Sequence, residues 1–210
     1  MRLTSSSFTA DGPIPDAYAF CTPDPETHAA LSTNRSPQLA WSHAPEGTRS
    51  FALVCIDPDA PTVATDVNQE GRRVPADLPR ADFHHWAMVD IPASCSELPA
   101  GSCSDGVTAG GKQDPPGPAG ARQGVNDYTS WFAGDADMGG TYHGYDGPAP
   151  PWNDERVHHY VFRLFALDVE RCDVGSGFTA PDVVAAVQGH VLAEAQITGT
   201  YTMDPALRGD

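Results

Sequence analysis

Four short segments contain most of the side chains in this sequence that could do chemistry. They are "DPDAP" (57–61), "HHW" (84–86), "GYDGPAPPW" (144–152) and "HHY" (158–160). Carboxylate, imidazole and phenol groups can hydrogen-bond a bound anion, and acids and histidines are also potential metal ligands. The first question is therefore whether these segments meet in one site, and which ligand that site would take.

Both histidine doublets lie in apolar segments whose pattern predicts strands. Successive residues of a strand point to opposite faces, so one histidine of each doublet serves any given site. In the second segment, His158 and Tyr160 share the apolar face. A polar pair on such a face either hydrogen-bonds internally or lines a cavity.

The loop between these strands is rich in proline. Proline has no N–H, so Ala149 is the only backbone donor within 148–151. Such a loop can hold one N–H in a fixed direction. An ordinary rigid turn is the alternative explanation.

Glycine and proline, 20 of each, separate many short apolar runs, which is typical of a mainly β protein. We expect strands over 38–42, 50–57, 84–91, 159–168 and 198–203. Long polar loops are expected over 62–82 and 102–127.

One helix is expected near the end of the chain, within 179–196. Pro181 suits the first helical turn, and apolar residues recur at helical spacing as far as Val191 and Leu192. We expect this helix to pack one face against the sheet.

Length and charge limit the class of protein. A chain of 210 residues is expected to form a single domain over 1–210. Its formal charge of −16, from 28 acidic and 12 basic residues, disfavours nucleic acid and anionic lipid as partners. The acidity fits either a surface adapted to high salt or an arginine-preferring genome.

The sequence favours a cytoplasmic protein without stable membrane insertion. It shows no secretory signal and no apolar stretch long enough to span a bilayer. Five cysteines without a C-x-x-C pair fit reduced thiols. Pairing of Cys95 with Cys103 under oxidation is the alternative.

The four segments, in this order, resemble the phosphatidylethanolamine-binding protein family, specifically its bacterial and archaeal YbhB/YbcL-type branch of Raf-kinase-inhibitor-like proteins. The likeness runs from "SPQLAWSHAPEGTRSFALVCIDPDAP" to "GHVLAEAQITGTYTM" and covers most of the chain. It implies two antiparallel β-sheets with Greek-key connections, peripheral helices and a pocket for phosphate-like anions. It also implies a homodimer.

The resemblance assigns ligand-binding roles by motif position. The residues concerned are Asp57, His85, His158, Tyr160, Gly147, Ala149 and Pro150. Related bacterial proteins often carry Cys or Gly at the position of Ala149, where alanine should serve unless a left-handed backbone is required.

Two acids of the first segment are expected to differ in role. A carboxylate facing an anion would repel it, so we expect Asp57 to orient His85 or to share a proton with the ligand. Asp59 is expected to be mainly a turn former. If protonated imidazole attracts the anion, binding should strengthen as the pH falls.

We therefore expect a non-catalytic protein that binds a small phosphate-bearing or other anionic ligand and needs no cofactor. Regulation of a kinase or protease partner is a further implication of the resemblance. The alternative is a metal site of two histidines and one carboxylate, although no H-x-H or H-x-x-x-H spacing supports it. A hydrolase would need a nucleophile motif such as G-x-S-x-G, which the chain lacks.

Overall fold

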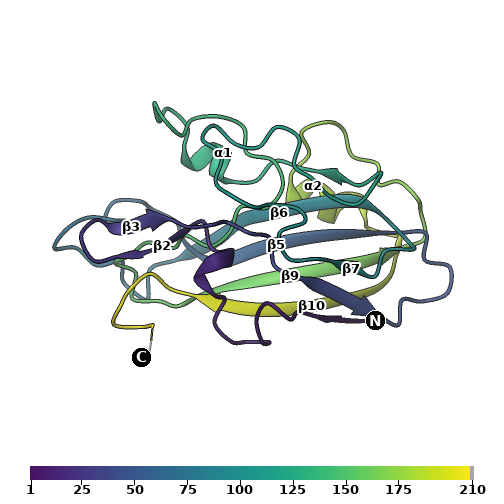
Figure 1. The fold of residues 1–210 in the computed structure, drawn as a ribbon, viewed down its shortest axis with the longest axis horizontal. Coiled ribbons are helices and arrows are strands. Elements are labelled where there is room, and N and C mark those ends of the chain that lie inside the picture. Colours follow the sequence, from purple (N-terminus) through teal and green to yellow (C-terminus); the bar gives the residue numbers. More distant parts are fainter. Residues whose placement is uncertain (209–210) are drawn as a thin grey trace.

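The computed structural model describes residues 1–208, and within them antiparallel strands form three sheets (Figure 1). The largest has the order β10 (Val191–Tyr201), β9 (His158–Leu167), β5 (Ser50–Pro61), β6 (Arg80–Pro92) and β8 (Arg122–Gln123). A smaller sheet contains β1 (Arg2–Thr4), β4 (Leu39–Ser42) and β7 (Glu97–Leu98). The third is a hairpin of β2 (Cys21–Asp24) and β3 (His28–Leu31).

The helices are short. They are the 3-10 turn η1 (Asp16–Tyr18), α1 (Tyr128–Trp131) and α2 (Ala180–Ala186). The expectation of a mainly β protein built from antiparallel sheets is confirmed.

The central strands each contain a continuous apolar run because both faces of the large sheet are covered there. On β5, Phe51, Leu53 and Cys55 belong to the larger core, which also contains residues of β1 and β4. The alternate residues Ala52 and Val54 pack on the other face, in a second core with residues of α2. A strand buried on both sides reads as a continuous apolar run, which explains "FALVC".

The expected helix over 179–196 is wrong in its second half. The helix α2 ends at Ala186, and Gly189 then takes a left-handed backbone with φ of 83°. From Val191 onward the chain is strand β10, which pairs with β9. Val191 and Leu192 are 39% and 42% exposed, so they do not extend the buried face of the helix.

The two polar segments are mostly loops, as expected. The first gives way to β6 at Arg80, and the second contains the short strand β8. All five cysteines are free thiols. Within residues 1–208, the structure has no helix with the length and apolar character that a bilayer crossing requires.

Candidate functional site

A cavity of about 460 Å³ lies where two central strands part. The pairing of β5 with β9 ends at Ile56 and Val161, so Asp57 and Tyr160 lie just beyond the last paired residues. Register shifts in the pairing of β5 with β6 flank Asp57. Such irregularities re-aim side chains and are common beside functional sites.

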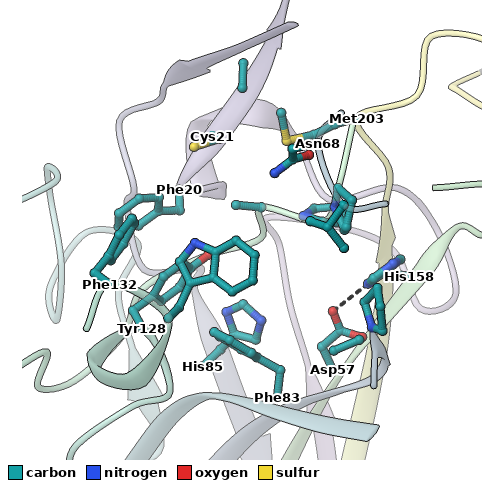
Figure 2. A pocket seen from close by; sticks show the side chains of 18 of the residues that line it. Phe20, Cys21, Asp57, Asn68, Phe83, His85, Tyr128, Phe132, His158 and Met203 are labelled. Carbon is teal, nitrogen blue, oxygen red and sulfur yellow. Dashed lines mark hydrogen bonds and ion pairs between the residues drawn. The ribbon is translucent and has the colours of Figure 1, made fainter. Parts of the chain in front are cut away.

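The cavity has a polar end and an apolar wall. Four of the residues predicted from the sequence, Asp57, His85, His158 and Tyr160, line it together, and all four are buried. Figure 2 shows Asp57 and His158 on one side and the aromatic rings of the opposite wall on the other, with His85 between them. The wall includes Phe20, Phe83, Tyr128, Phe132 and Met138.

His158 is bound by two carboxylates. Its Nδ1 lies 2.7 Å from Oδ2 of Asp57, and its Nε2 lies 3.1 Å from Oδ2 of Asp154. Burial alone would lower the pKa of His158, but the charge of Asp57 and hydrogen bonds to both acids outweigh burial and raise it to about 9. His158 is therefore an imidazolium at neutral pH, with both ring nitrogens engaged.

A buried arginine extends this chain of charges. Arg80 donates to both oxygens of Asp154, over 2.5 and 2.9 Å. Burial opposes the ionisation of Asp154, but hydrogen bonds from His158 and Arg80 lower its pKa. The sequence reasoning missed Asp154 and Arg80, although Asp154 lies only four residues before His158.

The expected partnership of Asp57 with His85 is wrong. His85 Nδ1 lies 2.8 Å from the backbone oxygen of Asp146, whereas Asp57 is bound to His158. Burial lowers the pKa of His85, and nearby acids oppose that shift only partly. His85 is therefore neutral at pH 7.

The Asp146 segment that holds His85 is itself anchored by its side chain. The Asp146 carboxylate accepts hydrogen bonds from Lys112 (2.5 Å), Asn34 (2.7 Å) and Asn126 (2.8 Å). Lys112 is the only lysine of the chain. The motif "GYDGP" contains Asp146, but nothing in the sequence shows that its backbone oxygen would face a histidine.

Tyr160 brings an unused donor to the cavity. Its hydroxyl is buried and has no hydrogen-bond partner among the described residues. Burial, and then the charge of Asp57, raise the pKa of this phenol, so the proton stays on the oxygen.

The proline-rich loop lies at the rim, with different roles for its residues. Ala149 and Pro150 line the cavity, and Ala149 does not adopt a left-handed backbone. Gly147 is not part of the lining among the described residues. A Cβ at Gly147 would lie 2.1 Å from the backbone oxygen of Tyr18, so glycine is required there by close packing.

The expectation that Asp59 is mainly a turn former is also wrong. Its carboxylate accepts from His159 Nδ1 (2.8 Å) and Arg156 Nη1 (3.0 Å), besides the His159 N–H. The turn is instead closed by Asp57, whose Oδ1 accepts the N–H of Asp59. Asp59 therefore holds His159, the outward-facing residue that follows His158 in the chain.

The geometry gives the alternative of a metal site no support. No group of three or more His, Cys, Asp or Glu side chains within residues 1–208 is arranged to hold a metal ion. Both nitrogens of His158 already meet carboxylates, and Nδ1 of His85 meets a carbonyl.

Comparison with known proteins gives a consistent result along nearly the whole chain. The family profile described as "Phosphatidylethanolamine-binding protein" matches residues 4–202. The YbhB protein of Escherichia coli (strain K12) is 36% identical over 80% of this chain and 82% of its own length. A protein of Methanothermobacter thermautotrophicus is 34% identical over 96% of this chain and 98% of its own.

Solved structures agree with the sequence comparison. Crystalline YbcL of Escherichia coli, described as a new member of the mammalian PEBP family, superposes with a TM-score of 0.67. It is 29% identical, and the match covers 96% of this chain and 97% of that one. A Chlamydia trachomatis homologue gives a TM-score of 0.64 at 26% identity, covering 95% of each chain.

Proposed function

Because this chain belongs to the phosphatidylethanolamine-binding protein family, we propose that it binds a small ligand with an oxyanion head group, phosphate-bearing in the first instance, without transforming it. The head group occupies the polar end of the cavity, between Tyr160, His85 and Asp57. Any organic part lies toward the apolar wall.

The observation that carries this proposal is the unpartnered hydroxyl of Tyr160. A buried hydroxyl without a hydrogen bond costs roughly 1–3 kcal/mol. Replacing it by a C–H would remove that cost at no loss of packing, so the hydroxyl makes sense where a ligand completes its bonding. Ala149 also lines the cavity, and no described residue accepts its N–H, so we take this N–H as a second donor for the ligand.

Isothermal titration of the intact protein with inorganic phosphate and with phosphoethanolamine tests the proposal. We expect saturable binding of at least one of them, and about a tenfold loss of affinity in Tyr160→Phe, since one hydrogen bond to a charged group is worth roughly 1.5–3 kcal/mol. The free energy of unfolding of Tyr160→Phe should stay equal or rise, because an unsatisfied buried group disappears.

Tyr145→Phe is the matched control. Its hydroxyl is also buried but donates to the backbone oxygen of Tyr18 at 2.6 Å, outside the cavity lining. This variant should lose about 1 kcal/mol of stability and keep its affinity. If neither anion binds the wild type, or if Tyr160→Phe binds as well as Tyr145→Phe, the proposal fails.

The non-catalytic part of the proposal rests on the inactive state of the thiols near the ligand. Cys21 lines the cavity, and burial raises its pKa to about 11, so it stays a thiol at neutral pH. Cys55 lies in the core, and burial raises its pKa well above the usual range. Recovery of phosphoethanolamine chemically unchanged after long incubation is the expected result, and release of phosphate would contradict it.

Regulation of a kinase or protease and assembly into a homodimer stay predictions. Light scattering coupled to size exclusion measures the second directly. A stable monomer at micromolar concentration would contradict it.

A further inference from the structure

We propose that this site selects oxyanions that still carry a proton, such as hydrogen phosphate, and rejects those that carry none, such as sulfate. The inference rests on the proposed function, because it concerns the same site, and it adds which chemical form of the ligand is taken. His85 and Asp57 determine the selection.

The hydrogen bond of His85 to the backbone fixes its tautomer. Its Nδ1 lies 2.8 Å from a backbone carbonyl oxygen, that of Asp146, and a carbonyl can only accept. The proton of the ring therefore sits on Nδ1, and the neutral ring has a lone pair on Nε2. Since Nδ1 is engaged, Nε2 is the nitrogen available to a ligand in the cavity, and it is an acceptor.

The polar group beside His85, the carboxylate of Asp57, is also an acceptor. Asp57 lines the cavity, and its oxygens accept from His158 and from the N–H of Asp59. Each carboxylate oxygen can accept a further hydrogen bond. A ligand oxygen placed here must therefore bring its own hydrogen.

Among residues 1–208, the cavity has no unpaired positive charge. No lysine or arginine is among the described residues that line it. The charge of His158 is balanced within the chain of Asp57, His158, Asp154 and Arg80, which contains two acids and two cations. A fully deprotonated anion would meet the lone pairs of two acceptors without net electrostatic attraction.

The donors complete the pattern. The Tyr160 hydroxyl has no partner among the described residues, and none of them accepts the Ala149 N–H. With this N–H directed at the ligand, the cavity offers two donors and two acceptors. Hydrogen phosphate has both kinds of oxygen, P–OH and P–O⁻, and matches this set. Sulfate has only acceptors and leaves Asp57 and His85 facing its lone pairs.

Titration of the intact protein with phosphate and with sulfate at about pH 7.5, above the unperturbed value of histidine, tests the inference. One charge-assisted hydrogen bond is worth about a tenfold to hundredfold difference in affinity, so phosphate should bind at least about tenfold more tightly than sulfate. Glycerophosphocholine, a soluble phosphodiester head group without P–OH, should fail as sulfate does. Strong binding of this diester would assign the site to membrane-lipid heads and overturn the inference.

The outcomes separate this inference from the proposed function. Equal affinity for phosphate and sulfate would leave oxyanion binding standing and overturn the selection. Failure of phosphate, sulfate and phosphoethanolamine alike would overturn both.

A variant and a spectroscopic measurement test the assignment to residues. Asp57→Asn presents an amide that can donate, so the preference for phosphate over sulfate should fall about tenfold or more. Asp168→Asn is the matched control, since Asp168 binds His190 at the exposed surface and should keep the preference.

If Asp57→Asn does not fold, a measurement on the wild-type protein still tests the assignment. Two-dimensional ¹⁵N NMR of the imidazole nitrogens reports the tautomer of each histidine. A proton on Nδ1 of neutral His85 is the expected result, and a proton on Nε2 would overturn the inference.

Discussion

The charge on His158 should make the stability of the protein depend on pH. The pKa of His158 is about 9 in the folded state against an ordinary value near 6.5. A raised pKa contributes stability that is complete below about pH 6.5 and is lost as the pH rises toward 9. We expect the free energy of unfolding in urea to fall by roughly 1–2 kcal/mol between about pH 6.5 and 8.

His158 is the main contributor in this window, and variants separate it from the thiols and His85, which contribute at the two ends of the window. Free thiols titrate near pH 8.5 in the unfolded chain, and His85, with its lowered pKa, changes charge below pH 6.5. His158→Gln should flatten the pH profile, whereas His190→Asn, at an exposed pair with Asp168, should keep it. A wild-type profile that is level across this window would contradict the assignment of a charged His158.

Of the two histidines in the cavity, only His85 can make ligand binding depend on pH. His158 stays charged throughout the range below its pKa of about 9, so it cannot switch between about pH 7.5 and 5. Burial lowers the pKa of His85 below its ordinary value, and Asp57, Asp127 and Asp146 oppose this shift only in part, so the ring takes up a proton only in acid, where Nε2 becomes a donor. Sulfate affinity should therefore rise about tenfold as the pH falls, because an acceptor is replaced by a charged donor.

The measurement is titration calorimetry with sulfate, whose charge is constant over this range. His85→Gln should lose the pH dependence, and His190→Asn should retain it. Sulfate affinity that stays constant over the pH range in which ¹⁵N NMR shows His85 taking up its proton would show that His85 does not meet the anion.

At the scale of elements, the rim loop 147–151 depends on one glycine. Its N–H donates to Asn34 Oδ1 (2.8 Å) and its oxygen accepts from the hydroxyl of Tyr128 (2.7 Å), so Gly147 joins three segments. Gly147→Ala places a Cβ against the backbone of Tyr18 and should cost roughly 1–3 kcal/mol of stability, as overpacking does. Phosphate affinity should fall as well, because Ala149 and Pro150 shift with the loop.

Urea unfolding of Gly147→Ala and Gly175→Ala measures this effect. A Cβ at Gly175 meets no heavy atom within 4 Å, and Gly175 is not in the left-handed region. Gly175→Ala should be neutral or stabilising by up to about 1 kcal/mol. Equal stability of the two variants would show that the loop accommodates the added methyl group at little cost.

Some elements could be predicted from the sequence and others could not, for physical reasons. Apolar runs bounded by turns identified β5, β6 and β9, because these strands are buried on both faces. The segment after Gly189 was misread because apolar residues such as Val191 suit a helical as well as an extended pattern. Only the pairing of β10 with β9 decides between them.

The same limit applies to the site. Motifs brought Asp57, His85, His158 and Tyr160 into one set, and the structure places them around one cavity. Which acid meets which histidine depends on where β5 and β9 part, and a register change of one residue would alter the partner.

At the scale of the whole molecule, the net negative charge lies mainly on exposed acids. Cations such as Arg80 and Lys112 are engaged in ion pairs with buried acids and do not neutralise the surface. Arg80 is bound to Asp154 with 6% of its side chain exposed, and Lys112 is bound to Asp146 with 11% exposed. Exposed acids such as Asp11, Glu46 and Asp77 form no ion pair with the described residues. The net charge of −16 therefore acts mainly through repulsion between surface carboxylates.

This repulsion predicts that salt stabilises the protein. Raising KCl from about 0.1 M to 1 M shortens the Debye length from about 10 Å to about 3 Å, which screens exposed charges but not the buried pairs. We expect the free energy of unfolding in urea to rise by about 1 kcal/mol or more over this range. The triple variant Asp11→Asn, Glu46→Gln and Asp77→Asn should be more stable than wild type at low salt and gain less from KCl. If the variant and the wild type gain equally, salt acts through hydrophobic burial rather than through surface charge, and the acidic surface is no adaptation to a saline environment.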